Sequence, residues 1–226
     1  MADREDREHR QGTSGLVCQN IKGNIYVPDE AYPYLVIQRG ALDDMKADPH
    51  TWVEKYCQAL QSEYWAMAPY LPAIVHAILD VGSGLGGIDI LLSRHYDHGA
   101  QITLLDGVDD RAEVDRHTKT FNSMAIAKQY MRANHVSHCD YIDANDPKRR
   151  AKRNYQLVVS LKAWCFHIEP RAHLELVAEC TQTDAALIVD VRRDKPDWED
   201  QLREHFQEVR VIYPGIKFQT IQYRRK

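Results

Sequence analysis

The sequence lacks the features that mark several large classes of protein. Its 226 residues contain no run of 18 apolar residues, which excludes a membrane-spanning helix on length. It also lacks an excess of basic residues. The formal net charge is −4, which disfavours binding of nucleic acid through overall charge. Because 44% of the residues are hydrophobic, the chain can bury the core of one α/β domain.

Cysteine is sparse and irregularly placed. The five cysteines form no Cys-x-x-Cys pair and no cluster with histidine that has zinc spacing. We therefore expect reduced thiols, a cytoplasmic location and no bound metal. The N-terminal residues are mostly charged and contain no apolar segment, which excludes a secretory signal and predicts a disordered tail over 1–14.

Residues 15–75 are expected to form an N-terminal extension. Glycine, proline and tyrosine alternate there with short β-like runs at 24–27 and 35–38, which predict loops or a small hairpin. From about Pro49 the apolar residues recur three and four positions apart, as on one face of an amphipathic helix. These apolar residues are Trp52, Val53, Tyr56, Leu60, Tyr64, Trp65 and Met67.

Strand and helix patterns alternate from residue 76 to the end of the chain. The strand patterns cover 77–81, 101–105, 136–142, 155–161, 185–191, 209–213 and 217–223. The helix patterns cover 87–95, 115–134, 171–181 and 198–206. Such alternation predicts a parallel sheet wound by right-handed crossovers, and the last two strands, joined by a turn, must pair antiparallel. We therefore predict an α/β fold: a Rossmann-like, doubly wound, mostly parallel seven-stranded sheet with a C-terminal antiparallel hairpin and helices on both faces.

A glycine-rich loop follows the first of these strands. From residue 80 it reads Asp-Val-Gly-Ser-Gly-Leu-Gly-Gly. Gly82, Gly84 and Gly87 fit the Gly-x-Gly-x-x-Gly pattern of dinucleotide sites, whereas Gly86 completes Gly-x-Gly-x-Gly. Glycines at such a turn let a nucleoside ligand lie against bare backbone. The carboxylate of Asp80 would repel a pyrophosphate, which argues against NAD and NADP.

The loop resembles the first motif of class I S-adenosylmethionine-dependent methyltransferases. This resemblance implies S-adenosylmethionine as the cofactor, with S-adenosylhomocysteine as its product, and places the methionine end of the cofactor near Asp80. It makes 76–226 the cofactor-binding domain. It gives a lid over the acceptor site as one interpretation of the extension, with burial of its helix in the core as the favoured alternative. The cofactor residues expected in the loop are Asp80, Gly82, Ser83, Gly84 and Gly86.

Carboxylates end the second and third strands of the pattern. Asp106, followed by Gly107, lies about twenty residues beyond the glycine loop, where a carboxylate can accept both hydroxyls of a ribose. The same spacing occurs in NAD enzymes. The resemblance assigns Asp143, followed by Ala144, to the amino group of adenine. Asp140 competes for this role, but strand alternation turns it to the opposite face.

The segment after the fourth strand is expected to face the transferring methyl group. It reads Ser-Leu-Lys-Ala-Trp-Cys-Phe-His from residue 160 and lacks the Asn/Asp-Pro-Pro-Tyr motif of enzymes that methylate base amines. It resembles Ser-Leu-x-x-Trp-x-x-His in bacterial and phage proteins labelled sugar O-methyltransferases. This resemblance implies that Ser160 and Leu161 contact the cofactor. His167 is the expected general base, with a loop-shaping histidine as the alternative.

Two side chains of this segment are candidates for contact with the acceptor. Lys162 would orient an acidic substrate, although a solvated lysine is the default, and Trp164 would either line the acceptor pocket or cap the sheet. Asp190 and Asp143 are conceivable metal ligands, but we expect no metal. The basic run 148–153 predicts a solvated loop, with phosphate contact as the alternative.

Together these patterns predict a methyltransferase that acts on a hydroxyl of a small or carbohydrate-like acceptor. Three alternatives remain open at this point. The acceptor could be an amine or a nucleic acid, the enzyme could be an NAD(P) oxidoreductase, or the chain could be a non-catalytic module that keeps the fold.

Overall fold

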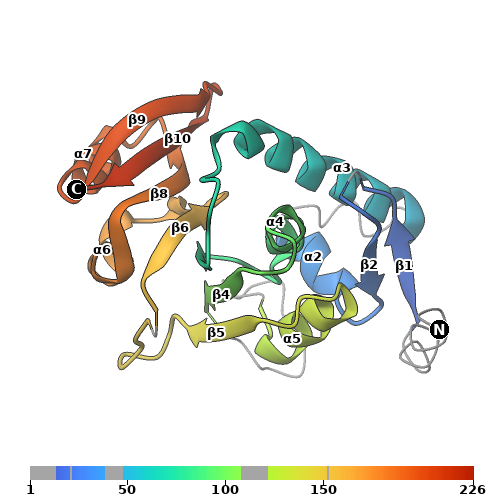
Figure 1. The fold of residues 1–226 in the computed structure, drawn as a ribbon. Coiled ribbons are helices and arrows are strands. Elements are labelled where there is room, and N and C mark those ends of the chain that lie inside the picture. Colours follow the sequence, from blue (N-terminus) through green and yellow to red (C-terminus); the bar gives the residue numbers. More distant parts are fainter. Residues whose placement is uncertain (1–13, 21, 39–47, 108–121, 152) are drawn as a thin grey trace.

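The computed structural model describes residues 14–20, 22–38, 48–107, 122–151 and 153–226. Almost all of the expected charged tail and the first part of the helix expected over 115–134 lie outside these ranges. Figure 1 shows a central sheet that carries the remaining elements, with the N-terminal hairpin and the C-terminal hairpin on opposite sides of the molecule.

The sheet has seven strands in the order β5-β4-β3-β6-β8-β10-β9. The first five in this order are parallel, whereas β10 is antiparallel to both of its neighbours. The prediction of a mostly parallel sheet that ends in an antiparallel hairpin is thus confirmed. The strands are β3 Ala77–Val81, β4 Gln101–Asp106, β5 Cys139–Asp143, β6 Tyr155–Ser160, β8 Thr181–Arg192, β9 Phe206–Tyr213 and β10 Phe218–Arg225.

Helices cover both faces of this sheet, as predicted. Alternate residues of β3 belong to different cores: Ile78 packs with α3, α4 and α5, whereas Leu79 packs with α6 and α7. This follows from the two-residue repeat of a strand. The helices of these layers are α3 Pro49–Met67, α4 Gly87–His95, α5 Met124–Ala133, α6 Leu174–Cys180 and α7 Pro196–Arg203, with 3-10 turns η2 Ala68–Tyr70 and η3 Pro170–Ala172.

The N-terminal extension combines a hairpin with two helices. Strand β1 (Gly15–Cys18) pairs antiparallel with β2 (Ile25–Pro28), so the expected small hairpin is present. The β-like run at 35–38 is instead the end of helix α2 (Tyr32–Gln38). The prediction was wrong here because β-branched residues in a short run also bury well on a helix that packs against a core, and tertiary packing overrides propensity.

The expectation that all cysteines are reduced was wrong for two of the five. Cys18 on β1 and Cys57 on α3 form a disulfide that ties the hairpin to the long helix, and both side chains are buried. Cys139, Cys165 and Cys180 are free thiols. Close spacing of cysteines in the sequence does not reveal this pair, because its members are 39 residues apart. The packing of β1 on α3 brings them together.

A short strand also occupies the segment that was expected to be a loop after the fourth strand. Strand β7 (Ala163–Ile168) is not among the seven strands of the sheet. Its residues Ala-Trp-Cys-Phe-His-Ile favour extended structure, a signal that the motif-based interpretation overlooked.

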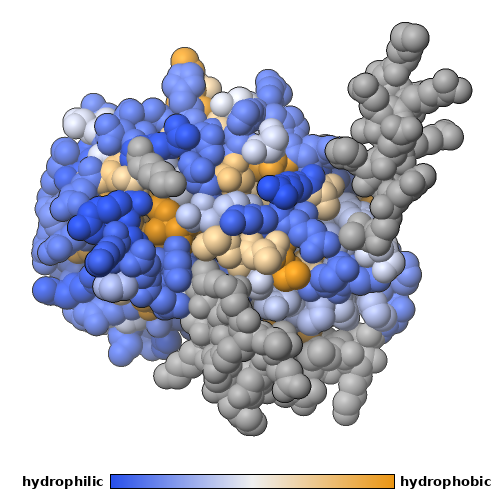
Figure 2. Space-filling model, turned by 90° about the horizontal axis from the view of Figure 1, so that it is seen from below, coloured by the Kyte–Doolittle hydropathy of each residue, from blue (hydrophilic) through white to orange (hydrophobic). Residues whose placement is uncertain are grey.

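The face of the molecule drawn in Figure 2 is mostly polar. On this face, small apolar patches lie between hydrophilic residues. Among the helices that the structure describes, none combines the length and the apolar character needed to cross a bilayer.

Candidate functional site

The strand order reverses beside the glycine-rich loop, and we call the residues at this reversal (80, 82–86, 89 and 106) the crevice. From β3 the chain adds β4 and β5 on one side of the sheet and then returns to place β6 on the other side of β3. In open α/β sheets, ligands bind at the carboxyl ends of the strands where the order reverses in this way. The loop at 82–86 follows the carboxyl end of β3, so the fold places it at that point.

The glycines of this loop meet conformational and steric requirements that other residues do not. Gly82, Gly84 and Gly86 have φ angles of 74°, 57° and 85°, which side chains rarely adopt. A Cβ atom on Gly82 would collide with Ala163, and one on Gly86 would lie 2.8 Å from the sulfur of Met131. The turn therefore brings the start of α4 tightly against the sheet and leaves its backbone bare.

Asp106 joins the second strand to this loop. Its Oδ2 accepts a hydrogen bond of 2.6 Å from the backbone N–H of Gly84. Burial raises the pKa of Asp106 to about 6, although the N–H groups of Gly84 and Gly107 favour its charged form. The sequence placed a carboxylate here by spacing alone, and the contact shows that it also fixes the shape of the glycine turn.

Asp143 lies directly beside Asp106 in the sheet. The two residues are register partners at the ends of β5 and β4, and the N–H of Ala144 donates to the carbonyl of Asp106 at 2.8 Å. Asp140 lies three residues earlier on β5 and forms an ion pair with Arg153 at 3.5 Å. The structure therefore brings Asp143 and Ala144 to the expected edge and keeps Asp140 away from it.

A second buried carboxyl group accompanies Asp80 and was missed by the sequence analysis. Asp89, in the first turn of α4, is fully buried, and its carboxyl group lies against that of Asp80. Burial raises the pKa of both groups: that of Asp89 to about 6, and that of Asp80 further, because the Asp89 charge adds to the effect. The signal that could have identified Asp89 is an acidic residue within an otherwise apolar helix pattern.

The end of β6 is fixed by hydrogen bonds within the protein. The Ser160 hydroxyl donates to the carbonyl of Val81 at 2.6 Å and accepts from the N–H of Trp164 at 3.0 Å. Trp164 is fully buried, and its indole N–H donates to the carbonyl of Pro170. These contacts favour the alternative in which Trp164 caps the sheet, and they use the Ser160 side chain to hold β6 against the glycine turn.

Lys162 contacts two acidic residues rather than solvent alone. Its backbone N–H donates to Asp190 at 3.1 Å, and its Nζ lies 2.6 Å from Oε1 of Glu63 on α3. Burial raises the pKa of Asp190 to about 6, whereas the hydrogen bond from Thr220 and the charge of Lys162 oppose this rise. Lys162 is thus largely exposed and also paired with an acidic residue of α3, and its contact with an acceptor stays a prediction.

His167 lies farther along β7 and is exposed. Its ring is 4.6 Å from that of Phe166, and partial burial together with the charge of Arg192 lowers its pKa, which favours the neutral imidazole. A neutral imidazole is the form that accepts a proton. Within the described parts of the chain, no cluster of three or more His, Cys, Asp or Glu side chains has a geometry suited to a metal ion.

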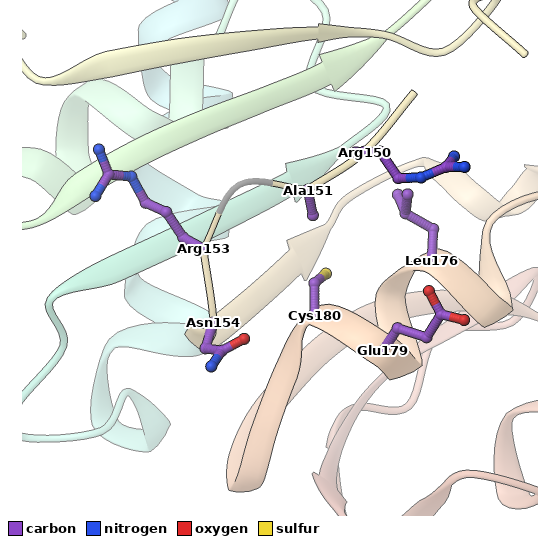
Figure 3. Close-up of a pocket in the computed structure, with 7 residues that line it drawn as sticks. All are labelled: Arg150, Ala151, Arg153, Asn154, Leu176, Glu179 and Cys180. Atoms are coloured by element: carbon purple, nitrogen blue, oxygen red, sulfur yellow. The ribbon is translucent and has the colours of Figure 1, made fainter. Parts of the chain in front are cut away.

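The basic residues that precede β6 lie at the amino ends of the parallel strands, opposite the end that carries the glycine loop. Arg150 and Arg153 line a pocket at the amino end of β6 with Leu176, Glu179 and Cys180, and Figure 3 shows their guanidinium groups pointing away from each other. Since the glycine loop follows the carboxyl end of β3, which is parallel to β6, this pocket is separate from the crevice.

Comparisons with known proteins bear on the fold. No protein-family model matches the sequence, and no match was found among the curated proteins. Many solved structures do match. The PH0226 protein from Pyrococcus horikoshii OT3 has a TM-score of 0.55 at 14% identity, covering 75% of this chain and 92% of its own. StiE O-MT has a TM-score of 0.58 at 10% identity, with coverage of 84% and 80%. A methyltransferase from Pyrococcus furiosus has a TM-score of 0.53 at 12% identity, with coverage of 73% and 82%.

This chain shares its fold with solved structures of methyltransferases. Sequence identities of 10–14% to these structures show a shared fold only. The cofactor and the acceptor are therefore inferred from the residues of the site. Within this fold the crevice combines a bare glycine turn with carboxyl groups from β3, α4 and β4.

Proposed function

We propose that the chain is an S-adenosylmethionine-dependent methyltransferase. The observation that carries the proposal is the hydrogen bond between Asp106 and the N–H of Gly84 at the point where the strand order reverses. It holds a carboxylate beside bare backbone, a combination suited to a ribose that lies against a glycine turn.

The residues of the crevice also fit the charge of this cofactor. S-adenosylmethionine carries a sulfonium and an ammonium group against one carboxylate, so it is a net cation. Asp106, whose pKa of about 6 leaves it mostly ionised at neutral pH, gives the crevice a negative charge, which attracts a cation and repels a pyrophosphate. This argument favours the methyl donor over NAD and NADP.

In the proposed reaction the protein mainly positions the reactants. When bound, S-adenosylmethionine supplies a methyl group on a sulfonium, and the thioether is a good leaving group, so proximity and alignment provide most of the acceleration. Asp80 and the loop residues Gly82, Ser83 and Gly86 hold the methionine end, Asp106 and Gly107 hold the ribose, and Asp143 and Ala144 hold the adenine.

The proposed acceptor is a hydroxyl of a small or carbohydrate-like molecule. Leu161 and Lys162 follow β6 at the crevice, and His167, whose lowered pKa favours the neutral ring, would take the hydroxyl proton. Replacing His167 with Ala is then expected to lower turnover more than cofactor affinity, a split that a role in loop shape alone would not produce.

Calorimetric titration tests the cofactor assignment. We expect wild-type protein to bind S-adenosylhomocysteine and to bind neither NAD nor NADP. Asp106→Ala should weaken this binding by about tenfold or more, because it removes a charged hydrogen-bond acceptor. Asp140→Ala, which removes a neighbouring carboxylate outside the crevice, is the matched control and should have little effect. Binding of NAD in preference to S-adenosylhomocysteine would contradict the proposal.

A further inference from the structure

Side chains from three separate elements meet at Gly84. The carboxylate of Asp106 on β4 accepts from the Gly84 N–H at 2.6 Å, and Nδ2 of Asn122 donates to the Gly84 carbonyl at 2.8 Å. The third side chain is Gln38, the last residue of α2. Neither carboxamide belongs to the motifs on which the proposed function rests.

Gln38 lies against the bare face of this glycine. A Cβ atom on Gly84 would be 2.6 Å from Oε1 of Gln38 and 3.3 Å from its Nε2, so the whole carboxamide faces the glycine where another residue would carry a side chain. Because Asp106 is bonded to the same glycine, the carboxamide and the carboxylate flank one short stretch of backbone.

Asn122 gives an independent indication of a ligand. Its side chain is 6% exposed, and its Oδ1 accepts no hydrogen bond from any described residue. The orientation of the amide is fixed, because the Gly84 carbonyl needs the Nδ2 donor. A buried acceptor without a donor costs on the order of 1–3 kcal/mol, which a ligand hydroxyl would recover.

We propose that Gln38 and Asn122 bind the sugar hydroxyls of the cofactor together with Asp106. A ribose hydroxyl both donates and accepts, so Oδ1 of Asn122 and the carboxylate of Asp106 serve as acceptors, and the Gln38 carboxamide supplies a donor and an acceptor. The N-terminal extension thereby contributes a direct cofactor contact. This inference rests on the proposed function and extends it to residues outside the glycine loop.

The extension has other attachments that do not involve Gln38. The hydroxyl of Tyr56 occupies the space that a Cβ on Gly87 would need, and Glu63 pairs with Lys162 at 2.6 Å. Substituting Gln38 therefore should not detach the extension, and binding can be measured on a folded protein.

The experiment compares two ligands that share the nucleoside. S-adenosylhomocysteine and 5′-methylthioadenosine are titrated into wild-type protein, Gln38→Ala and Gln38→Met, the last of which keeps the side-chain length. Both variants should weaken both ligands by the same factor, about five- to twentyfold, since one or two hydrogen bonds are lost. Gln58→Ala, at an exposed position of α3, is the matched control and should bind like the wild type.

Gln38→Glu provides a second readout. A carboxylate at this position would lie beside that of Asp106, so the loss of affinity should exceed that of Gln38→Ala and should grow between pH 5.5 and pH 8.

Three results would contradict the inference. Unchanged affinity in both Gln38→Ala and Gln38→Met would show that the carboxamide makes no contact. A loss for S-adenosylhomocysteine alone would place Gln38 at the methionine end rather than at the sugar. If wild-type protein binds neither nucleoside, the proposed function fails and this inference fails with it, a result distinct from the other two.

Discussion

At the scale of single residues, Asp89 is a fully buried carboxyl group in unfavourable surroundings. Both of its oxygens are buried without a donor of good geometry, and the carboxyl of Asp80 lies against it. A folded-state pKa raised to about 6 means that the folded protein holds the proton more tightly than the unfolded chain. The associated loss of stability therefore begins as the pH rises above about 4 and is complete above about 6.

We expect Asp89→Asn to stabilise the protein at pH 8 by roughly 1 to 3 kcal/mol, because the amide cannot ionise. At pH 3.5, below the unfolded pKa of about 4, the carboxyl is largely protonated in both the folded and the unfolded state, and the change should be small. Thermal unfolding at both pH values tests this, with Asp97→Asn at an exposed turn as control. Equal effects of Asp89→Asn at pH 3.5 and pH 8 would refute the assignment.

At the scale of elements, an ion pair connects α3 to the segment between β6 and β7. Glu63 and Lys162 are 2.6 Å apart with side-chain exposures of 16% and 43%, so the pair is only partly shielded from solvent. Helix α3 thereby contacts the segment that is expected to face the transferring methyl group.

We expect a double-mutant cycle with Glu63→Gln and Lys162→Met to give a coupling of about 1 kcal/mol in denaturant unfolding. The coupling should fall in 1 M NaCl, because salt screens exposed charge. The pair Arg171–Glu204, at 4.0 Å and with both side chains largely exposed, is the matched control and should couple weakly. Equal coupling in both pairs would show that the α3 contact has no special strength.

At the scale of the whole molecule, the disulfide links two parts of the N-terminal extension that are 39 residues apart in sequence. The bridge between Cys18 and Cys57 closes a loop that contains α2 and the first half of α3, both of which pack on the core of the sheet. A cross-link of this length stabilises chiefly by restricting the unfolded chain.

Reduction should lower the free energy of unfolding by about 3 to 4 kcal/mol and lower Tm accordingly. Thermal unfolding with and without a phosphine reductant measures this change, and Cys57→Ala should make Tm insensitive to the reductant. Thiol titration of the denatured, unreduced protein should find three thiols, since two of the five cysteines are bridged. A count of five would contradict the disulfide.

Local sequence patterns determined the elements and the cofactor loop. The strand at 77–81 and the helix at 87–95 match the structure residue for residue, because burial on both faces of a parallel strand and on one face of a helix leaves a regular apolar repeat. The position of Asp106 at a strand end was also readable from spacing. Such features depend on neighbours along the chain.

Only the tertiary structure decided the contacts between distant segments. The disulfide, the partners of Lys162 and the approach of Gln38 to Gly84 each join elements far apart in sequence. The strand order and the packing of α2 and α3 on the glycine turn set these distances, and no periodic pattern records them. The sequence by itself determined which elements form and where the glycine turn lies, whereas the close packing of those elements decided which side chains surround it.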